Sequence, residues 1–457
     1  MSAKIMSDDC QIGSFCIFCS RTGSLLSLSC PIILSQLGSI IIGWADTVMV
    51  GQYGTLELSA AGFVNNIFSL VIFFLLGFSY ATTPVVGDYY SKGDYNGVIQ
   101  ARRSSIFVNL IASLCIVALL AILYFKIEIL RQPQELLPLI RPYFLVLLFS
   151  LPFQAVFNAL KQCIEATGDA KTPMWVIMGS ITLNVILNYL LIYGRLGLPE
   201  LGLVGAGVAT LISRVVTMLS LLLLRNRKLL GVQQKGDCMF HDAIRLTRLG
   251  IPIGMQLCIE SGSFNVCAIF MGWIGATALA AHQVMCTIGA FGFMIYYGIG
   301  AAAAIRIAYY KGRNEWIEVK ATTRTSLYIA LCFSGVIVSV ICLYRAQIAS
   351  LFTTSIEVTT LFISFLPAFI CYQVGDCMQT IYANSLRAIE DVRCLMPYAF
   401  ISYGILTIPL AYIFAFSLKF GATGVWWSFP IGLTTAGVLY FLRFNKVYRN
   451  RLDKLNN

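Results

Sequence analysis

Long apolar segments separated by short polar ones run through almost the whole chain. Twelve of them are long enough to cross a bilayer, since a spanning helix needs about 20 mostly apolar residues. They lie at 31–50, 58–84, 105–125, 140–161, 174–194, 203–224, 251–273, 279–305, 324–344, 359–387, 396–418 and 422–442. Within lipid a segment satisfies its backbone groups as a helix. The pattern predicts an all-α polytopic membrane protein with twelve transmembrane helices.

The composition excludes an ordinary soluble domain. Hydrophobic residues make up 58% of the 457 residues, and charged residues only 12%, against roughly a quarter in soluble proteins. Of the 15 cysteines, most lie in the apolar segments, where free cysteine behaves as a small hydrophobic residue. Cys10, Cys16 and Cys19 precede the first segment, and the sequence does not assign them a role.

The net charge of +11 is a topology signal rather than a nucleic-acid site. Alternate loops carry 25 of the 32 lysines and arginines, the opposite loops carry six, and Arg214 lies inside the sixth apolar segment. Positive loops stay in the cytoplasm, so we expect both termini there, in a multi-pass protein of the cell inner (plasma) membrane. The expected partners are lipids and a small substrate, without nucleic acid, and the protein is expected to be a monomer.

The second half of the chain repeats the first at an offset of 221 residues. The matched pairs include Pro31 with Pro252, Gly51 with Gly272, Gly77 with Gly298 and Tyr89 with Tyr310. Six crossings preserve orientation, so the halves are parallel repeats, with a substrate site expected near mid-membrane. The predicted organisation is a cytoplasmic segment 1–29, a six-helix lobe 30–224, a cytoplasmic linker 225–250, a second six-helix lobe 251–442 and a cytoplasmic basic tail 443–457.

Three carboxylates lie inside apolar segments: Asp46, Glu260 and Asp376. A charge in hydrocarbon is costly, so such residues face a bundle interior or a water-filled cavity and mark ion or proton paths. We therefore predict that all three couple transport to a cation. Hard oxygen ligands suit sodium, so Glu260 and Asp376, in the same half, are the candidate Na⁺ site.

Polar side chains near the carboxylates are candidates for supporting the cavity or the ion site. They are Gln256, Ser263, Gln373, Thr380, Asn384, Asn184 and Asn188. A hydrogen-bonding role between helices remains an alternative, above all for Asn184 and Asn188. The partner of Arg214 is left open by the sequence.

Enzymatic chemistry is not expected. The sequence has no Walker loop of the pattern G-x-x-x-x-G-K-[ST] for ATP, and no catalytic triad or metal-ligand cluster. We expect no cofactor, and the energy for transport is expected to come from a gradient of Na⁺ or H⁺.

Several motifs resemble the MATE (multidrug and toxic compound extrusion) family, and within it the NorM-type branch. They are ADTVMVG at 45–51, GDAKTP at 168–173, Asn184 with Asn188, LGIP at 249–252 before Glu260, AAHQV at 280–284, and Asp376 with SLR at 385–387. The resemblance implies that Asp46, Glu260 and Asp376 are cation-coupling residues. The related DinF-type branch has an acidic residue in its fifth helix, where this chain has asparagines.

The leading functional hypothesis is a secondary antiporter that exports organic cations or drugs in exchange for Na⁺ or H⁺ by alternating access. One alternative is a lipid-linked or polysaccharide flippase of the same superfamily, which would be expected to line its cavity with several basic groups. Another is a membrane scaffold without transport, which the three separated carboxylates disfavour.

Overall fold

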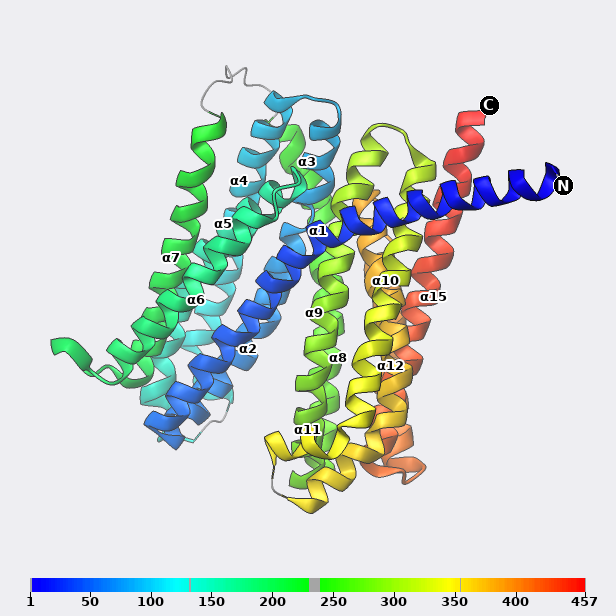
Figure 1. Ribbon diagram of the computed structural model, residues 1–457. Coiled ribbons are helices and arrows are strands. Elements are labelled where there is room, and N and C mark those ends of the chain that lie inside the picture. Colours follow the sequence, from blue (N-terminus) through cyan, green and yellow to red (C-terminus); the bar gives the residue numbers. More distant parts are fainter. Residues whose placement is uncertain (1, 131–132, 230–238, 354, 457) are drawn as a thin grey trace. The chain divides into compact units, whose positions relative to one another are not determined.

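The fold was analysed in a computed structural model that describes residues 2–130, 133–229, 239–353 and 355–456 (Figure 1). Twelve helices in these ranges are long and apolar enough to cross a membrane, which confirms the predicted fold class. The candidate spans are Arg21–Tyr53, Thr55–Ser91, Tyr95–Phe125, Leu137–Ala166, Lys171–Ile192, Gly202–Leu224, His241–Ile274, Ala276–Gly312, Trp316–Leu343, Ile356–Ala388, Leu395–Ser417 and Gly421–Lys454.

The described part of the chain contains fifteen α-helices, of which α11 lies in none of these spans. They are α1 (Ser2–Tyr53), α2 (Thr55–Ser79), α3 (Thr82–Ser91), α4 (Tyr95–Phe125), α5 (Leu137–Ala166), α6 (Lys171–Ile192), α7 (Gly202–Leu229), α8 (Met239–Ile274), α9 (Ala276–Gly312), α10 (Trp316–Leu343), α11 (Arg345–Phe352), α12 (Ile356–Ala388), α13 (Leu395–Ala399), α14 (Ile408–Tyr412) and α15 (Gly421–Asn456). The eleventh span joins α13 and α14 through the π-helical segments Phe400–Thr407 and Ile413–Ser417.

The chain forms two compact units, each described by itself. The amino-terminal unit is Leu34–Cys258, and the carboxy-terminal unit combines Met1–Ile33 with Ile259–Asn457. These units differ from the predicted lobes 30–224 and 251–442, because α1 and α8 each contribute to both units. The periodicity of an apolar segment does not show which neighbours it packs against. Of the predicted linker 225–250, residues 230–238 lie outside the described part, as do the side chains of Cys10, Cys16 and Cys19.

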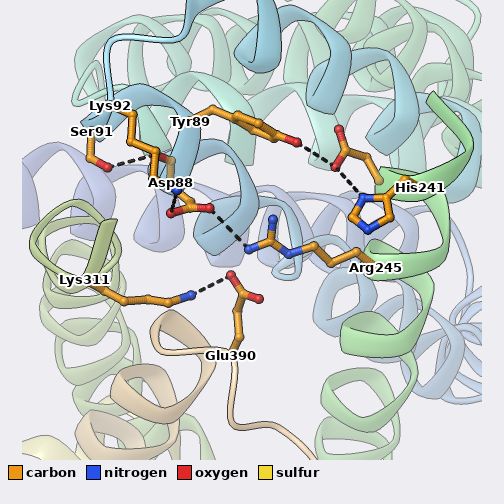
Figure 2. Close-up of polar contacts among 9 residues, drawn as sticks. Asp88, Tyr89, Ser91, Lys92, His241, Arg245, Lys311 and Glu390 are labelled. Atoms are coloured by element: carbon orange, nitrogen blue, oxygen red, sulfur yellow. Dashed lines mark hydrogen bonds and ion pairs between the residues drawn. The ribbon is translucent and has the colours of Figure 1, made fainter. Parts of the chain in front are cut away.

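Polar contacts explain why the first part of α8 belongs to the amino-terminal unit (Figure 2). Asp88 on α3 pairs with Arg245 of α8 at 3.5 Å and with Lys92 at 2.9 Å. The hydroxyl of Tyr89 donates a hydrogen bond to Asp242, which is fully buried, at 3.1 Å. The start of α8 is therefore attached to α3 by an ion pair and a hydrogen bond.

The equivalent positions of α1 attach to the carboxy-terminal unit. Arg21 and Ser24 lie 221 residues before Asp242 and Arg245. Arg21 pairs with Glu318 on α10 at 2.5 Å, and Arg306 on α9 donates to Ser24. The first membrane span of each repeat, Arg21–Tyr53 and His241–Ile274, is thus held at its start by polar contacts at matching positions.

The amino-terminal unit packs around α5, which contacts α2, α4 and α7. Its core contains Phe68 of α2 and Phe144 of α5, whose rings meet edge to face with centroids 5.0 Å apart. The last turn of α6 and the first turn of α7 approach closely at Gly205, where an added Cβ would lie 2.5 Å from the carbonyl oxygen of Leu191. The backbone of α6 therefore occupies the space that a side chain at position 205 would need.

We expect Gly205→Ala to lower the thermal stability of the folded protein, because the new methyl group would meet fixed backbone. Overpacking of this kind typically costs about 1–3 kcal/mol. The matched control is Gly62→Ala, since a Cβ on this helical glycine meets nothing within 4 Å. Thermal unfolding of both purified variants in detergent checks this, and equal unfolding temperatures would contradict it.

The carboxy-terminal unit packs around α12, which contacts α9, α10 and α15. Aromatic rings from three of these helices fill its interior: Phe365 and Phe369 of α12, Trp426 and Phe429 of α15, and His282 of α9. All five are at most 1% exposed. Near the end of α12, Lys311 pairs with Glu390 at 2.7 Å (Figure 2). This packing holds α12 in the middle of its unit.

Candidate functional site

Two of the three predicted carboxylates lie in the carboxy-terminal unit, on different helices. Glu260 is on α8 and Asp376 is on α12. The side-chain amide of Gln379 donates to Glu260 Oε2 at 3.0 Å. The hydroxyl of Thr380 lies 3.3 Å from Asp376 Oδ1 and 3.1 Å from Gln379 Oε1. Gln379 and Thr380 therefore form a polar bridge between the two carboxylates.

This pair is buried. Asp376 is 1% exposed and Glu260 is 9% exposed, and the negative charge of Glu260 acts on Asp376. The second oxygen of Asp376, Oδ2, has no hydrogen-bond partner in the described residues. Two neighbouring buried carboxylates are not stable with both charges uncompensated. The arrangement can therefore take up a proton or a cation.

Gln373 lies one turn before Asp376 on α12 and is fully buried. Neither its oxygen nor its nitrogen has a partner among the residues that the structure describes. An added Cβ on Gly292 of α9 would lie 3.2 Å from the Gln373 nitrogen, so this glycine leaves space beside the amide. Gln373 thus offers an unused buried oxygen near Asp376.

The other predicted support residues of this unit are used by their own helices. Ser263 donates to the backbone oxygen of Glu260 at 2.8 Å, and Asn384 donates to that of Thr380 at 2.9 Å. Gln256 lies one turn before Glu260 on α8 and is fully buried, within the residues of the amino-terminal unit. Ser263 and Asn384 therefore have hydrogen-bonding roles in the structure.

The position of Gln379 between the carboxylates and the burial of Arg387 were not predicted from the sequence. Gln379 follows Asp376 by three residues and so lies on the same helical face, which was the signal available. Arg387, the last residue of the predicted segment 359–387, is one of the 25 cations that the charge count assigns to the cytoplasmic loops, but it lies in α12, is 4% exposed and donates to Asn384 Oδ1 at 3.3 Å. Its positive charge acts on Glu260. Lys161, another assumed loop cation, is 5% exposed and lies 3.8 Å from Glu165.

Asp46 lies on α1 and belongs to the amino-terminal unit, whereas the other two carboxylates belong to the carboxy-terminal unit. Asn188 of α6 donates to Asp46 Oδ1 and also to Asn184 Oδ1, the latter at 3.3 Å. Arg214 of α7 donates to Ser150 of α5 at 2.6 Å, and its charge attracts Asp46. The partners of Arg214, which the sequence left open, are therefore Ser150 and the charge of Asp46.

Metal binding by several acidic or soft ligands is not indicated. Among the described residues, no group of three or more His, Cys, Asp or Glu side chains could hold a metal ion. The other oxygen atoms beside Glu260 and Asp376 belong to amide and hydroxyl groups, which are hard ligands of the kind that sodium accepts.

Comparisons with known proteins agree with this fold. The MatE family model matches residues 31–190 and 252–413. The "Probable multidrug resistance protein NorM" of Bradyrhizobium diazoefficiens is 31% identical over 435 residues, covering 93% of each chain. The chain is a membrane transporter rather than an enzyme. It belongs to the MATE family and is similar to members of the NorM-type branch.

Solved structures show the same fold at lower identity. A mutant of the Vibrio cholerae MATE transporter VcmN matches with a TM-score of 0.86 and 20% identity, over 95% of this chain and 98% of that one. A MOP superfamily transporter from Pyrococcus furiosus matches with a TM-score of 0.83 and 21% identity, over 94% and 96%. At these identities the match establishes the fold alone.

Proposed function

We propose that this transporter is a secondary antiporter that exports small organic cations in exchange for Na⁺ or H⁺ by alternating access. The observation that carries the proposal is the buried pair Glu260 and Asp376, joined through Gln379 and Thr380. A sodium ion or proton bound there compensates one of the two negative charges and so removes the repulsion between the carboxylates. Burial and release of that ion can therefore be coupled to a change of conformation.

Na⁺ is the coupling ion that we propose. A sodium ion needs several hard oxygens, and the residues near Asp376 supply them in Gln373, Gln379 and Thr380. The Gln373 side-chain oxygen and Asp376 Oδ2 are two such oxygen ligands, and neither has a hydrogen-bond partner in the described part of the chain. A proton would need only one carboxylate and would leave these oxygens unused.

Vesicle transport tests the function and the ion together. The purified protein is reconstituted, loaded with a cationic dye and given either a sodium gradient at fixed pH or a pH gradient without sodium. We expect dye movement to follow the sodium gradient. Movement that ignores sodium and follows the pH gradient would reverse the choice of ion, and movement with neither gradient would contradict coupled antiport.

The proposed location is the cell inner (plasma) membrane, with both termini in the cytoplasm. The unequal distribution of lysine and arginine between alternate loops supports this orientation. A fluorescent protein that matures only in the cytoplasm, fused after Asn457, provides the test. Absence of fluorescence in cells that express the fusion at full length would contradict the orientation.

A further inference from the structure

The first turns of α10 and the last turns of α15 carry aromatic rings and cations that meet within the carboxy-terminal unit, where the two helices are in contact. On α10, Trp316, Lys320 and Arg324 follow one another at intervals of four residues and therefore share one face of the helix. On α15, Tyr448 and Arg451 are three residues apart and share a face in the same way. We call these five residues the basic seam.

Each helix places a cation over an aromatic ring of the other helix. Lys320 Nζ lies 4.6 Å from the ring centroid of Tyr448, and the guanidinium carbon of Arg451 lies 5.7 Å from the ring of Trp316. Both rings are buried, whereas Arg451 is exposed and Lys320 is half-buried. Because the face of an aromatic ring attracts a cation, the two charges are held in place without a carboxylate.

The cations of the basic seam lack compensating carboxylates. In the part of the chain that the structure describes, no Asp or Glu side chain forms an ion pair with Lys320, Arg324 or Arg451. The nearby Arg443, by contrast, donates to both oxygens of Asp391 at 2.6 and 2.9 Å. Like charges one helical turn apart, such as Lys320 and Arg324, repel each other. The seam is therefore suited to an anion that comes from outside the chain.

Exposed apolar side chains continue from the seam toward the middle of both helices. Tyr328 of α10 is 50% exposed, and Phe441 and Leu442 of α15 are 37% and 57% exposed. We call these three residues the apolar surface. Tyr382 of α12 connects it to the seam, because its ring meets that of Phe441 edge to face at 5.2 Å and the charge of Arg324 acts on it. Cations above an apolar surface match the two parts of an anionic phospholipid.

The seam lies at the depth of lipid head groups. At helical rise, Lys320 is about 35 Å from Leu343 at the far end of α10, and Tyr448 is about 40 Å from Gly421 at the far end of α15. These lengths exceed the hydrocarbon core of about 30 Å but not the whole bilayer of about 40–45 Å. Trp and Tyr are also the aromatic residues that membrane interfaces favour.

We propose that the basic seam binds the phosphate head group of an anionic phospholipid, in the leaflet on the proposed cytoplasmic side, with the acyl chains against the apolar surface. Lys320 and Arg451 bind the phosphate oxygens, and the rings of Trp316 and Tyr448 position these two cations. A zwitterionic lipid is disfavoured because the seam repels its choline cation. The bound lipid joins α10 to α15, and the inference does not depend on the coupling ion or on the exported substrate.

Lipid titration of the purified protein, delipidated in an uncharged detergent and followed by native mass spectrometry, tests the inference. The wild type is expected to bind phosphatidylglycerol about tenfold more tightly than phosphatidylcholine with the same acyl chains. Glycerol phosphate, the soluble head group, is the third ligand and is expected to bind more weakly because it lacks the chains. Equal affinities for the two lipids would overturn the inference, and glycerol phosphate that binds as tightly as the lipid would overturn the choice of a lipid.

A pair of double variants locates the site. Lys320→Gln combined with Arg451→Gln is expected to weaken binding of phosphatidylglycerol about tenfold. The matched control, Lys446→Gln combined with Arg449→Gln, removes two exposed cations from a different face of α15 and is expected to change the affinity less than about twofold. Equal weakening by both double variants would indicate diffuse attraction and overturn the site, as would unchanged binding by the seam variant.

Single variants cover the case in which the seam double variant does not fold. Arg324→Gln changes one exposed side chain and is expected to weaken binding of phosphatidylglycerol about threefold. Tyr448→Leu keeps every cation but removes the ring under Lys320, so it is expected to weaken binding, whereas Tyr448→Phe keeps the ring and is expected to bind like the wild type. Unchanged affinity in both Arg324→Gln and Tyr448→Leu would overturn the inference.

Discussion

Glu260→Gln and Asp376→Asn are each expected to reduce gradient-driven efflux about 100-fold while leaving the protein folded. The physical reason is that the two carboxylates lie in one buried network through Gln379 and Thr380, so both are needed to bind the driving cation. A factor of about 100 lies at the upper end of ordinary coupling between two binding sites. The measurement is dye efflux from vesicles with an imposed gradient.

The matched control is Glu357→Gln, which makes the same chemical change at an exposed carboxylate at the start of α12. Gln379→Leu and Thr380→Val are two further informative variants, because they break the polar bridge but keep both carboxylates. Each is expected to weaken efflux less than loss of a carboxylate. Normal efflux by well-folded Glu260→Gln and Asp376→Asn would show that the pair does not couple transport.

Asp46→Asn is expected to reduce export of a cationic dye about tenfold and to slow its release on the outer side. Asp46 lies in the other compact unit and accepts its hydrogen bond from Asn188, so the effect is expected without any change in the hydrogen bonds of Glu260 and Asp376. Substrate and ion then compete through a change of conformation, and each lowers the affinity of the other by the same factor. Efflux and dye affinity, each measured with and without sodium, check both parts.

Two further variants separate the charge of Asp46 from its geometry. Asn188→Ala keeps the carboxylate but removes the amide that donates to it, so a smaller loss is expected. Glu128→Gln removes an exposed carboxyl group outside the candidate spans and is expected to leave export unchanged. Unchanged export and unchanged sodium dependence in Asp46→Asn would remove Asp46 from the mechanism.

Local sequence patterns were sufficient to predict the membrane fold and to select the candidate carboxylates. An apolar run of about 20 residues in lipid has few alternatives to a helix, so the spans follow from composition and length. Intramembrane carboxylates such as Glu260 and Asp376 are conspicuous because nearly everything around them is apolar. The family resemblance, carried by short motifs at these positions, agrees with the match over 31–190 and 252–413.

Two cations that the charge pattern assigned to loops are buried in the structure. Arg387 and Lys161 lie near the predicted ends of apolar segments, where a lysine or arginine normally reaches water, yet both are buried. A long helix can extend beyond its apolar run, as α5 does from Lys161 to Ala166, and neighbouring helices then cover the charge. Such coverage depends on residues distant in the chain, so no local pattern shows it.

The sequence by itself determined the helical class, the twelve spans and the presence of three intramembrane carboxylates, because each depends on residues close together in the chain. The repeat needed only a comparison of the two halves of the sequence. Only the tertiary structure decided that Gln379 joins Glu260 to Asp376, that Arg214 rests on Ser150, and that α1 and α8 each contribute to both compact units. The physical reason is that these contacts join residues tens to hundreds of positions apart. Their geometry is set by the packing of whole helices, which the apolar periodicity of any one segment does not contain.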